Sequence, residues 1–208
     1  MKSGVAQARA PGAVGLVIAG GRSVRFGGEK AVATRHGRPL LLWAAQRLQG
    51  SCPVVAVNAR PATGAAALAH AHGYTVLHDA PGDATGPLAG VKAGLHWAKG
   101  LGAHTLAVSP CDAPLLPADL FTRLLAAAAG GAAMAETPGG LEPLCAVWPV
   151  SALDAVTAAL AHGAHPPTWR LLESLGAQHV RFDDPSAFVN LNTPADLAAV
   201  AAGLTHQR

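Results

Sequence analysis

The chain has 208 residues, a length that fits one domain or one domain with a small elaboration. Half of the residues are hydrophobic and 13% are charged, which argues against a disordered chain and allows a large buried core. The formal charge is only +3, and the sequence contains no dense run of lysine or arginine, so we expect no nucleic-acid partner.

The cysteines and the first residues bear on the cellular compartment. Cys52, Cys111 and Cys145 are far apart and odd in number, so they suggest neither a disulfide framework nor a zinc motif. Residues 1–11 are polar, and we expect them to be flexible rather than a signal peptide. No apolar stretch approaches the ~18 residues of a membrane span, so we expect a cytoplasmic protein with no membrane partner.

Short apolar runs alternate with helical patterns along the first half of the chain. The pattern predicts strands at 14–19, 54–57, 74–77 and 105–108. It predicts helices between them at 39–48, 61–72, 88–99 and 117–129, the last with Pro117 in its first turn. Crossover helices between successive strands are typical of a parallel sheet that is covered on both faces.

The second half is less regular but continues the alternation. We predict strands at 132–136, 143–148 and 179–182, and helices at 151–161, 168–175 and 193–202, the last capped by Thr193. The whole pattern predicts an α/β fold of three layers, α/β/α, with a mostly parallel, Rossmann-like sheet. No linker divides the chain, so we expect one domain over residues 12–203.

The loop after the first predicted strand, from Gly20 to Lys30, is the most informative segment. Its glycines let backbone amides approach an anion closely, and Arg25 and Lys30 add cationic groups, a combination that fits a polyphosphate. A Walker A loop is excluded because Lys30 lies between Glu29 and Ala31. The plainer alternative is a glycine-rich turn with exposed charges.

A dinucleotide-binding loop of an NAD(P)-dependent oxidoreductase is also disfavoured. That loop has the spacing G-x-G-x-x-G, whereas here two Gly-Gly pairs are separated by five residues. It also requires an acidic residue near the end of the second strand, where this chain has Asn58.

Polar residues follow other predicted strands, where parallel sheets bind their ligands. Asp112 can hold Mg²⁺ against phosphates, with helix capping as the alternative. Asn58 offers a donor and an acceptor to a purine edge, and Asp79 is either a ligand or a turn residue. Asn190 and Asn192 alternate along an extended segment and should point the same way, to a ligand or to brace the loop.

Residues 18–30 resemble the signature L-A-G-G-x-S-x-R-M-G-x-D-K of nucleotidyltransferases with a Rossmann-like fold. More narrowly, the chain resembles the MobA-like molybdenum cofactor guanylyltransferase family. Further matches run from about residue 14 to 200, at 37–40, 58, 79, 86–90, 110–114, 142–144 and 188–194. The chain departs from the family at Phe26 and Glu29, at Glu142, and where only His165 and Arg170 replace a basic cluster.

The resemblance implies a nucleotide-diphospho-sugar transferase type of fold, with nucleotide bound before about residue 115 and acceptor after it. It implies catalytic roles for Arg25, Lys30 and Asp112, with Mg²⁺ on Asp112, and acceptor binding by Asn190 and Asn192. The nucleotide-binding positions that it implies are Ile18, Ala19, Gly20, Gly21, Lys30, Asn58, Asp79, Gly86 and Asp112.

The implied reaction transfers GMP from GTP to molybdopterin, with or without bound molybdenum, and releases pyrophosphate. Partners would be these two substrates and, transiently, proteins that make or receive the cofactor. A cytidylyltransferase for the same cofactor and a sugar-phosphate nucleotidyltransferase are the nearest alternatives. A non-catalytic nucleotide-binding chaperone for cofactor insertion is an alternative of another class.

Overall fold

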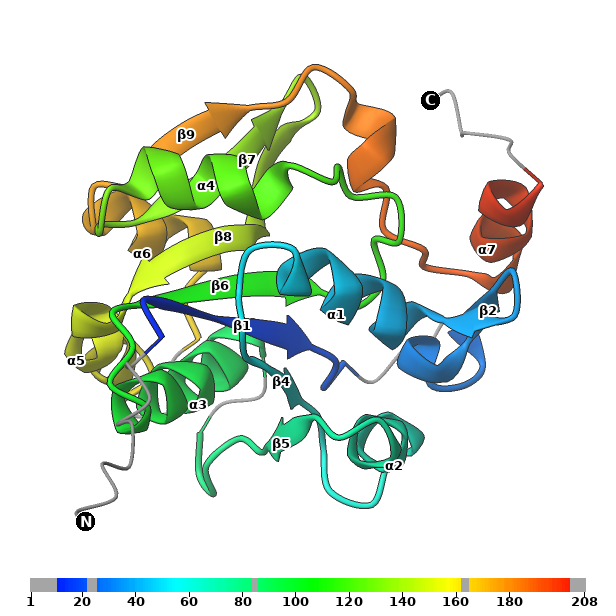
Figure 1. Cartoon of the computed structure of the whole chain (residues 1–208), viewed down its shortest axis with the longest axis horizontal. Helices are drawn as coiled ribbons and strands as arrows, with labels where there is room; N and C mark the ends of the chain where they lie inside the picture. Colours follow the sequence, from blue (N-terminus) through cyan, green and yellow to red (C-terminus); the bar gives the residue numbers. More distant parts are fainter. Residues whose placement is uncertain (1–10, 22–25, 84–85, 162–164, 203–208) are drawn as a thin grey trace, which may run out of the picture.

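A single twisted sheet runs through the centre of the molecule (Figure 1). The structure, a computed structural model, describes residues 11–21, 26–83, 86–161 and 165–202. The strand order is β5-β4-β1-β6-β8-β7-β9. The bounds of these strands are β1 Ala13–Ile18, β4 Val55–Asn58, β5 Thr75–Leu77, β6 Thr105–Pro110, β7 Ala133–Thr137, β8 Gly140–Pro149 and β9 Gln178–Arg181.

The sheet is mostly parallel, as the sequence predicts. In this sheet, β8 runs antiparallel to its neighbours β6 and β7, and the other described pairings of the same sheet are parallel. The helices are α1 Leu40–Gln49, α2 Gly64–Ala71, α3 Pro87–Gly100, α4 Leu120–Ala128, α5 Leu153–Ala159, α6 Thr168–Ser174 and α7 Pro194–Ala201. Helices α1, α2 and α4 contribute to the core on one face of the sheet, and α3, α5 and α6 to the core on the other.

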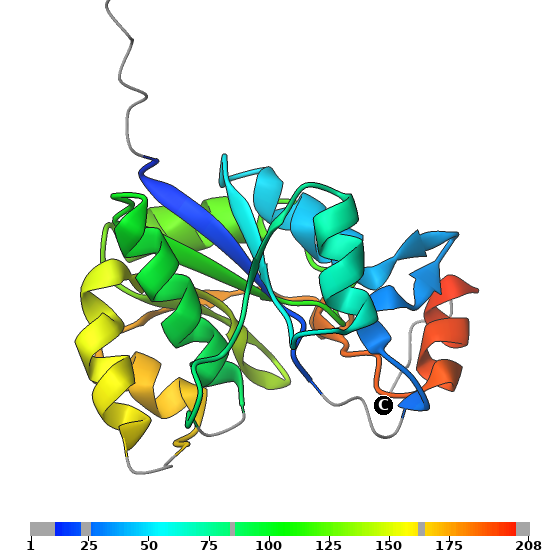
Figure 2. The ribbon, with the colours of Figure 1, turned by 90° about the horizontal axis from the view of Figure 1, so that it is seen from below.

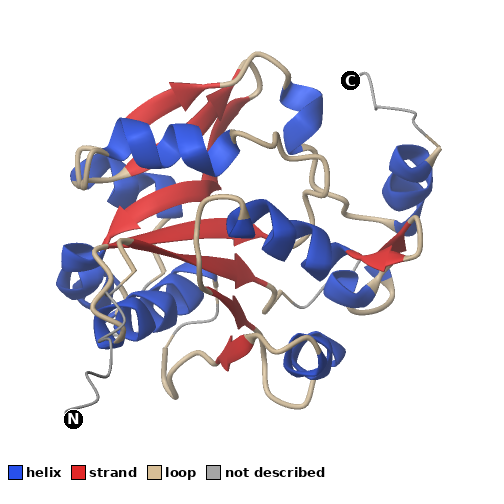
Figure 3. Ribbon diagram, in the orientation of Figure 1, coloured by secondary structure: helices blue, strands red, loops and turns tan. Residues whose placement is uncertain are grey.

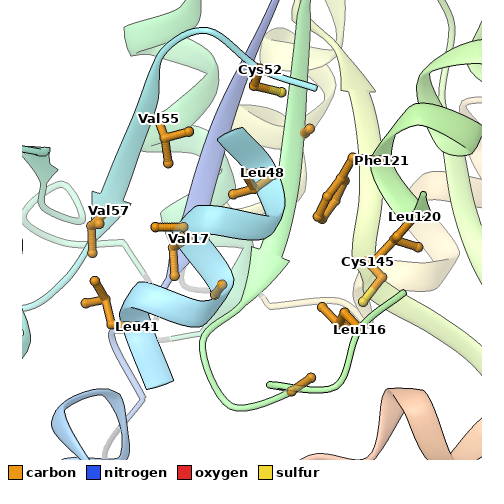
Figure 4. Close-up of a cluster of buried hydrophobic side chains, with 14 of the residues drawn as sticks. Val17, Leu41, Leu48, Cys52, Val55, Val57, Leu116, Leu120, Phe121 and Cys145 are labelled. Carbon is orange, nitrogen blue, oxygen red and sulfur yellow. The ribbon is translucent and has the colours of Figure 1, made fainter. Parts of the chain in front are cut away.

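These two cores confirm the three-layer α/β/α architecture (Figures 2 and 3). Neighbouring strand residues alternate between them: Leu16 belongs to one core and Val17 to the other, and both are fully buried. Figure 4 shows the core formed with α1, α2 and α4, which contains Val17 of β1, Leu41 and Leu48 of α1 and Phe121 of α4. Burial of each such side chain contributes about 1.5–3 kcal/mol to the transfer free energy.

Helix α7 packs at the end of the sheet that carries the carboxyl termini of the parallel strands (Figure 1). Leu191 and Val200 bury themselves there against Leu40 at the start of α1. The predicted cap is confirmed, because Thr193 accepts a hydrogen bond from Asp196 N and the Asp196 side chain accepts from Thr193 N. This packing brings the segment before α7 to the edge where ligands bind.

Several boundaries differ from the predicted ones. The helix predicted from Pro117 begins at Leu120, and the Pro117 carbonyl instead accepts from Leu120 N in a turn. The helix predicted from residue 61 begins at Gly64, because Ala62 adopts a left-handed conformation with φ of 55° and Thr63 then caps the helix. The hairpin of β2 (Thr34–Arg35) and β3 (Arg38–Pro39) was not predicted.

The part of the chain that the structure describes contains no helix both long and apolar enough to cross a bilayer. The segment predicted to be flexible, residues 1–11, lies outside the described residues except for Pro11.

The core of Figure 4 gives a direct test of the packing. Phe121→Ala removes a side chain that is 1% exposed, so we expect the free energy of unfolding to fall by about 3–5 kcal/mol. Thr122→Ala, next to it on the exposed side of α4, removes an exposed hydrogen bond to Ser51 Oγ and should lower that free energy by no more than about 1 kcal/mol. Urea unfolding of the two variants measures the difference, and equal losses would contradict this placement of α4.

Candidate active site

A pocket of about 560 Å³ opens at the carboxyl ends of β1, β4 and β6. This volume lies within the range of small-molecule binding sites. It gathers ten of the residues predicted from the sequence, Ile18, Ala19, Gly20, Gly21, Lys30, Asn58, Asp79, Gly86, Asp112 and Asn192. The two described ends of the glycine-rich loop therefore face the same cavity as the polar residues that follow the other strands.

The side chain of Lys30 joins three distant parts of the chain. Its Nζ lies 2.8 Å from Asp112 Oδ2 and donates to Asn192 Oδ1 at 3.0 Å. These contacts span 82 and 162 residues. The Lys30 and Asp112 side chains are only 13% and 21% exposed, so water screens their attraction less than it would at the surface.

The backbone around Asp112 holds this arrangement in place. Cys111 N donates to Ile18 O, which ties the end of β6 to the end of β1. Leu191 N donates to Asp112 O at 2.9 Å, which ties the segment before α7 to the same point. Asp112 and Asn192 therefore meet Lys30 through backbone contacts as well as through their side chains.

Glu29 links the glycine-rich loop to helix α2. Its two carboxylate oxygens accept hydrogen bonds from Gly64 N at 3.0 Å and Ala65 N at 2.9 Å, in the first turn of α2. A carboxylate is favourable at this end of a helix because of the exposed N–H groups and the helix dipole. A Cβ on Gly64 would lie 3.2 Å from Glu29 Oε2, so the glycine permits the close contact. The contact fixes the residue immediately before Lys30.

Asn58 and Asp79 form a pair on the other side of the pocket. Asn58 is 3% exposed, and its Nδ2 donates to Asp79 Oδ1 at 2.9 Å. The amide donor that was predicted for a purine edge is thus directed at Asp79, and Asn58 acts here as the residue that positions this carboxylate. A Cβ on Gly90 would lie 2.5 Å from Asn58 Oδ1, so the last glycine of the 86–90 block allows α3 to approach.

One predicted site residue is not brought to the pocket, and another cannot be placed. Asn190 is exposed and does not line it, although its carbonyl accepts from Asn192 Nδ2 at 3.4 Å. Arg25 lies outside the described residues. Asn190 and Asn192 therefore do not share one environment, because Asn192 turns toward Lys30 while Asn190 remains at the surface.

Other lining residues were missed by the sequence reasoning. Arg60 is an exposed cation two residues beyond the end of β4, and this position was the signal that could have revealed it. Leu144 of β8 adds an apolar wall. His165 lies against Gly86, and its Nε2 accepts from Leu88 N at 3.3 Å, so it occupies the start of α3.

Cys111 lies beside Asp112 in the pocket but is unsuited to be a nucleophile. Its residue surface is partly exposed, yet burial of the thiol raises its pKa well above the ordinary value. The Asp112 carboxylate raises that pKa further, and the Lys30 ammonium offsets only part of the effect. The thiol therefore stays protonated near neutral pH, as its interpretation as a small packing residue requires.

The oxygen atoms around Lys30 fit a small hard cation. Within the described ranges, no three His, Cys, Asp or Glu side chains cluster as a metal site. Mg²⁺ needs no such cluster, because it takes one or two carboxylates and completes its shell with phosphate oxygens and water. Asp112 Oδ2 and Asn192 Oδ1 already share one cation, the Lys30 ammonium, so their chemistry suits a second.

Comparison with known proteins now identifies the family. The model of the MobA-like NTP transferase domain matches residues 15–180. The chain belongs to the MobA-like NTP transferase family. It is therefore a nucleotidyltransferase, and the resemblance seen in the sequence is confirmed.

Relatives in sequence extend over most of the chain. A molybdenum cofactor guanylyltransferase of Cereibacter sphaeroides is 41% identical over 185 residues, which cover 88% of this chain and 93% of the relative. Another of the same name, from Acidiphilium cryptum (strain JF-5), is 38% identical and covers 90% and 93%.

Solved structures share the fold of this MobA-like chain. Molybdopterin-guanine dinucleotide biosynthesis protein A of Archaeoglobus fulgidus superposes with a TM-score of 0.73 at 22% identity, covering 91% of this chain and 97% of that one. A nucleotidyl transferase from Methanothermobacter thermautotroptrophicus gives 0.71 at 17% identity, covering 92% and 97%. Together these likenesses confirm the Rossmann-like fold class.

The contact between Glu29 and α2 can be tested separately from catalysis. Glu29→Ala should lower the free energy of unfolding by about 1 kcal/mol, because it removes a helix cap. It should also raise the KM for nucleotide about tenfold, because Lys30 is no longer held in position.

Asp184→Ala is the matched control, because Asp184 caps the short 3₁₀ helix Pro185–Phe188 through Ser186 N and does not line the pocket. It should destabilise similarly with an unchanged nucleotide KM. Equal nucleotide KM values for the two variants would contradict the positioning role of Glu29.

Proposed function

We propose that this chain transfers GMP from GTP to the phosphate of molybdopterin, releasing pyrophosphate and forming the guanine dinucleotide form of the molybdenum cofactor. The observation that carries the proposal is the meeting of the glycine-rich loop, Lys30 and Asp112 in one pocket. Membership of the MobA-like family, with relatives named molybdenum cofactor guanylyltransferase, supports the choice of substrates.

The triphosphate binds at the end of β1. The amides of Gly20 and Gly21 approach its oxygens, and Lys30 and Arg60, which both line the pocket, supply positive charge. We propose Arg25, on the basis of the sequence resemblance alone, as a further phosphate ligand. Binding draws the Lys30 ammonium toward phosphate and leaves the oxygens of Asp112 to a divalent cation, for which we propose Mg²⁺.

The base binds near Asp79, whose Oδ1 is held by the buried amide of Asn58. Guanine presents two adjacent donors, N1–H and the 2-amino group, and a carboxylate accepts both. Cytosine offers one amino donor beside an acceptor nitrogen, which a carboxylate would repel. This difference favours GTP over CTP as the nucleotide.

The reaction needs alignment and charge neutralisation more than a strong base. The ionised phosphate of molybdopterin attacks the α-phosphorus of GTP in line, a P–O bond forms, and the bond to pyrophosphate breaks with its electron pair. Lys30 offsets negative charge on the triphosphate and on the departing pyrophosphate. When bound, Mg²⁺ on Asp112 would offset further phosphate charge.

The test measures pyrophosphate release and dinucleotide formation with purified molybdopterin, Mg²⁺ and either GTP or CTP. We expect turnover with GTP and much less with CTP. Asp112→Asn and Lys30→Ala should each lower kcat by about 10²–10³-fold, the size of losing one group that stabilises transition-state charge, while circular dichroism stays unchanged.

The alternatives give different results in the same assay. Preferential incorporation of CMP would identify a cytidylyltransferase, and nucleotide binding without pyrophosphate release would favour a chaperone. Incorporation of neither nucleotide would remove the molybdopterin assignment, and near-normal turnover in both variants would refute the roles of Lys30 and Asp112.

A further inference from the structure

Strand β8 carries a large bulge beside the pocket. Met134 of β7 pairs with Ala146, but the next residue, Ala135, pairs with Glu142. One step along β7 therefore spans four along β8, and Pro143, Leu144 and Cys145 lie outside the regular ladder. Such bulges redirect side chains and are common next to active sites. Here the bulge brings Leu144 to the pocket wall.

Glu142 is the residue at which the bulge begins, and its side chain is partly buried. Among the described residues, no hydrogen bond or ion pair reaches its carboxylate. Burial raises the pKa of this carboxyl group. A carboxylate that loses water without gaining a hydrogen-bond partner lowers the stability of the fold, so the position of Glu142 is not explained by folding.

The charges of Glu142 and of Asp112, which lies in the pocket, both act on a third residue, Cys145. Beyond the effect of its own burial, the carboxylates of Glu142 and Asp112 both raise the pKa of the Cys145 thiol. Cys145 thus lies within the fields of both acids. In the chain, Glu142 lies two residues before Leu144, and Leu144 lines the same pocket as Asp112.

The charge of Glu142 restricts what can bind against it. Phosphates are repelled by a carboxylate, and their counter-charges, Lys30 and Arg60, belong to loops of the first half of the chain. A ligand group that binds Glu142 must instead present hydrogen-bond donors. The pyrimidine edge of a pterin does so, since its N3–H and 2-amino group lie side by side and match the two oxygens of a carboxylate.

Resting on the proposed function, we propose that Glu142 binds the N3–H and 2-amino edge of the acceptor's pterin ring and so selects a pterin as acceptor. Leu144 supplies apolar surface for the ring beside it. The acceptor then extends from its phosphate near Asp112 toward the bulge of β8, away from the nucleotide. Glu142 is a specificity-determining residue and takes no part in bond making.

The first test is Glu142→Gln, which keeps the shape but places an amide donor against the donors of the pterin. We expect the KM for molybdopterin to rise about tenfold or more, the loss typical of a charge-assisted hydrogen bond. The KM for GTP should stay within about twofold, and Tm at pH 8 should equal or exceed that of the wild type because an unpaired charge is gone. Glu173→Gln, which removes an exposed carboxylate on α6, is the control and should leave both KM values unchanged.

The second test compares pterin with lumazine, in which a carbonyl replaces the 2-amino group, as inhibitors competing with molybdopterin. The wild type should prefer pterin, and Glu142→Gln should reduce or reverse that preference because its amide donates to the lumazine carbonyl. A general structural defect would weaken both inhibitors alike and would not change the preference between them.

The outcomes separate this inference from the proposed function. If the wild type transfers GMP but Glu142→Gln keeps the wild-type KM for molybdopterin and the preference for pterin, Glu142 does not read the ring. A fall in Tm with equal rises in both KM values would assign Glu142 a structural role and overturn the inference. If the wild type transfers no GMP to molybdopterin, the proposed function fails and the inference fails with it.

Discussion

The organisation of the site depends most on one ammonium group, that of Lys30, held between Asp112 and Asn192. Lys30 and Asp112 come after β1 and β6, and Asn192 lies in the segment before α7, so the contact joins parts of the chain up to 162 residues apart at the carboxyl edge of the sheet. A partly buried lysine needs nearby negative or polar oxygens, because the loss of water around its charge is costly. Phosphate oxygens satisfy the same need, which makes this cluster a natural place for a nucleoside triphosphate.

The neighbouring contacts hold the groups around Lys30 at fixed positions. Glu29 anchors the end of the glycine-rich loop to α2, and Asn58 anchors Asp79. Helix α7 packs on α1 and keeps the segment of Asn192 in place. Preorganised positions of this kind lower the barrier of a reaction whose reactants are already charged, because little rearrangement is left for the transition state.

Much of the fold and of the candidate site could be predicted from the sequence, because the patterns that indicate them lie within short segments of the chain. A buried strand that ends in Gly20-Gly21, and Asp112 directly after another strand, place both groups at one edge of a parallel sheet. The contact of Glu29 with Gly64 could not be predicted, since it depends on the left-handed turn at Ala62 that starts α2 late. The β8 bulge was missed because the pattern of 143–148 is that of an ordinary strand, and only pairing with β7 shows the extra residues. Asn190 and Asn192 share a motif but separate in space, because one of them has Lys30 as a partner.

The most direct test is a crystal structure of the chain with Mg²⁺ and a non-hydrolysable GTP analogue. We expect the triphosphate along Gly20 and Gly21, Lys30 Nζ within hydrogen-bond distance of a phosphate oxygen, and the metal bound to Asp112. A nucleotide bound elsewhere, or Lys30 still paired with Asp112 and no metal at that carboxylate, would contradict the central role given to this cluster.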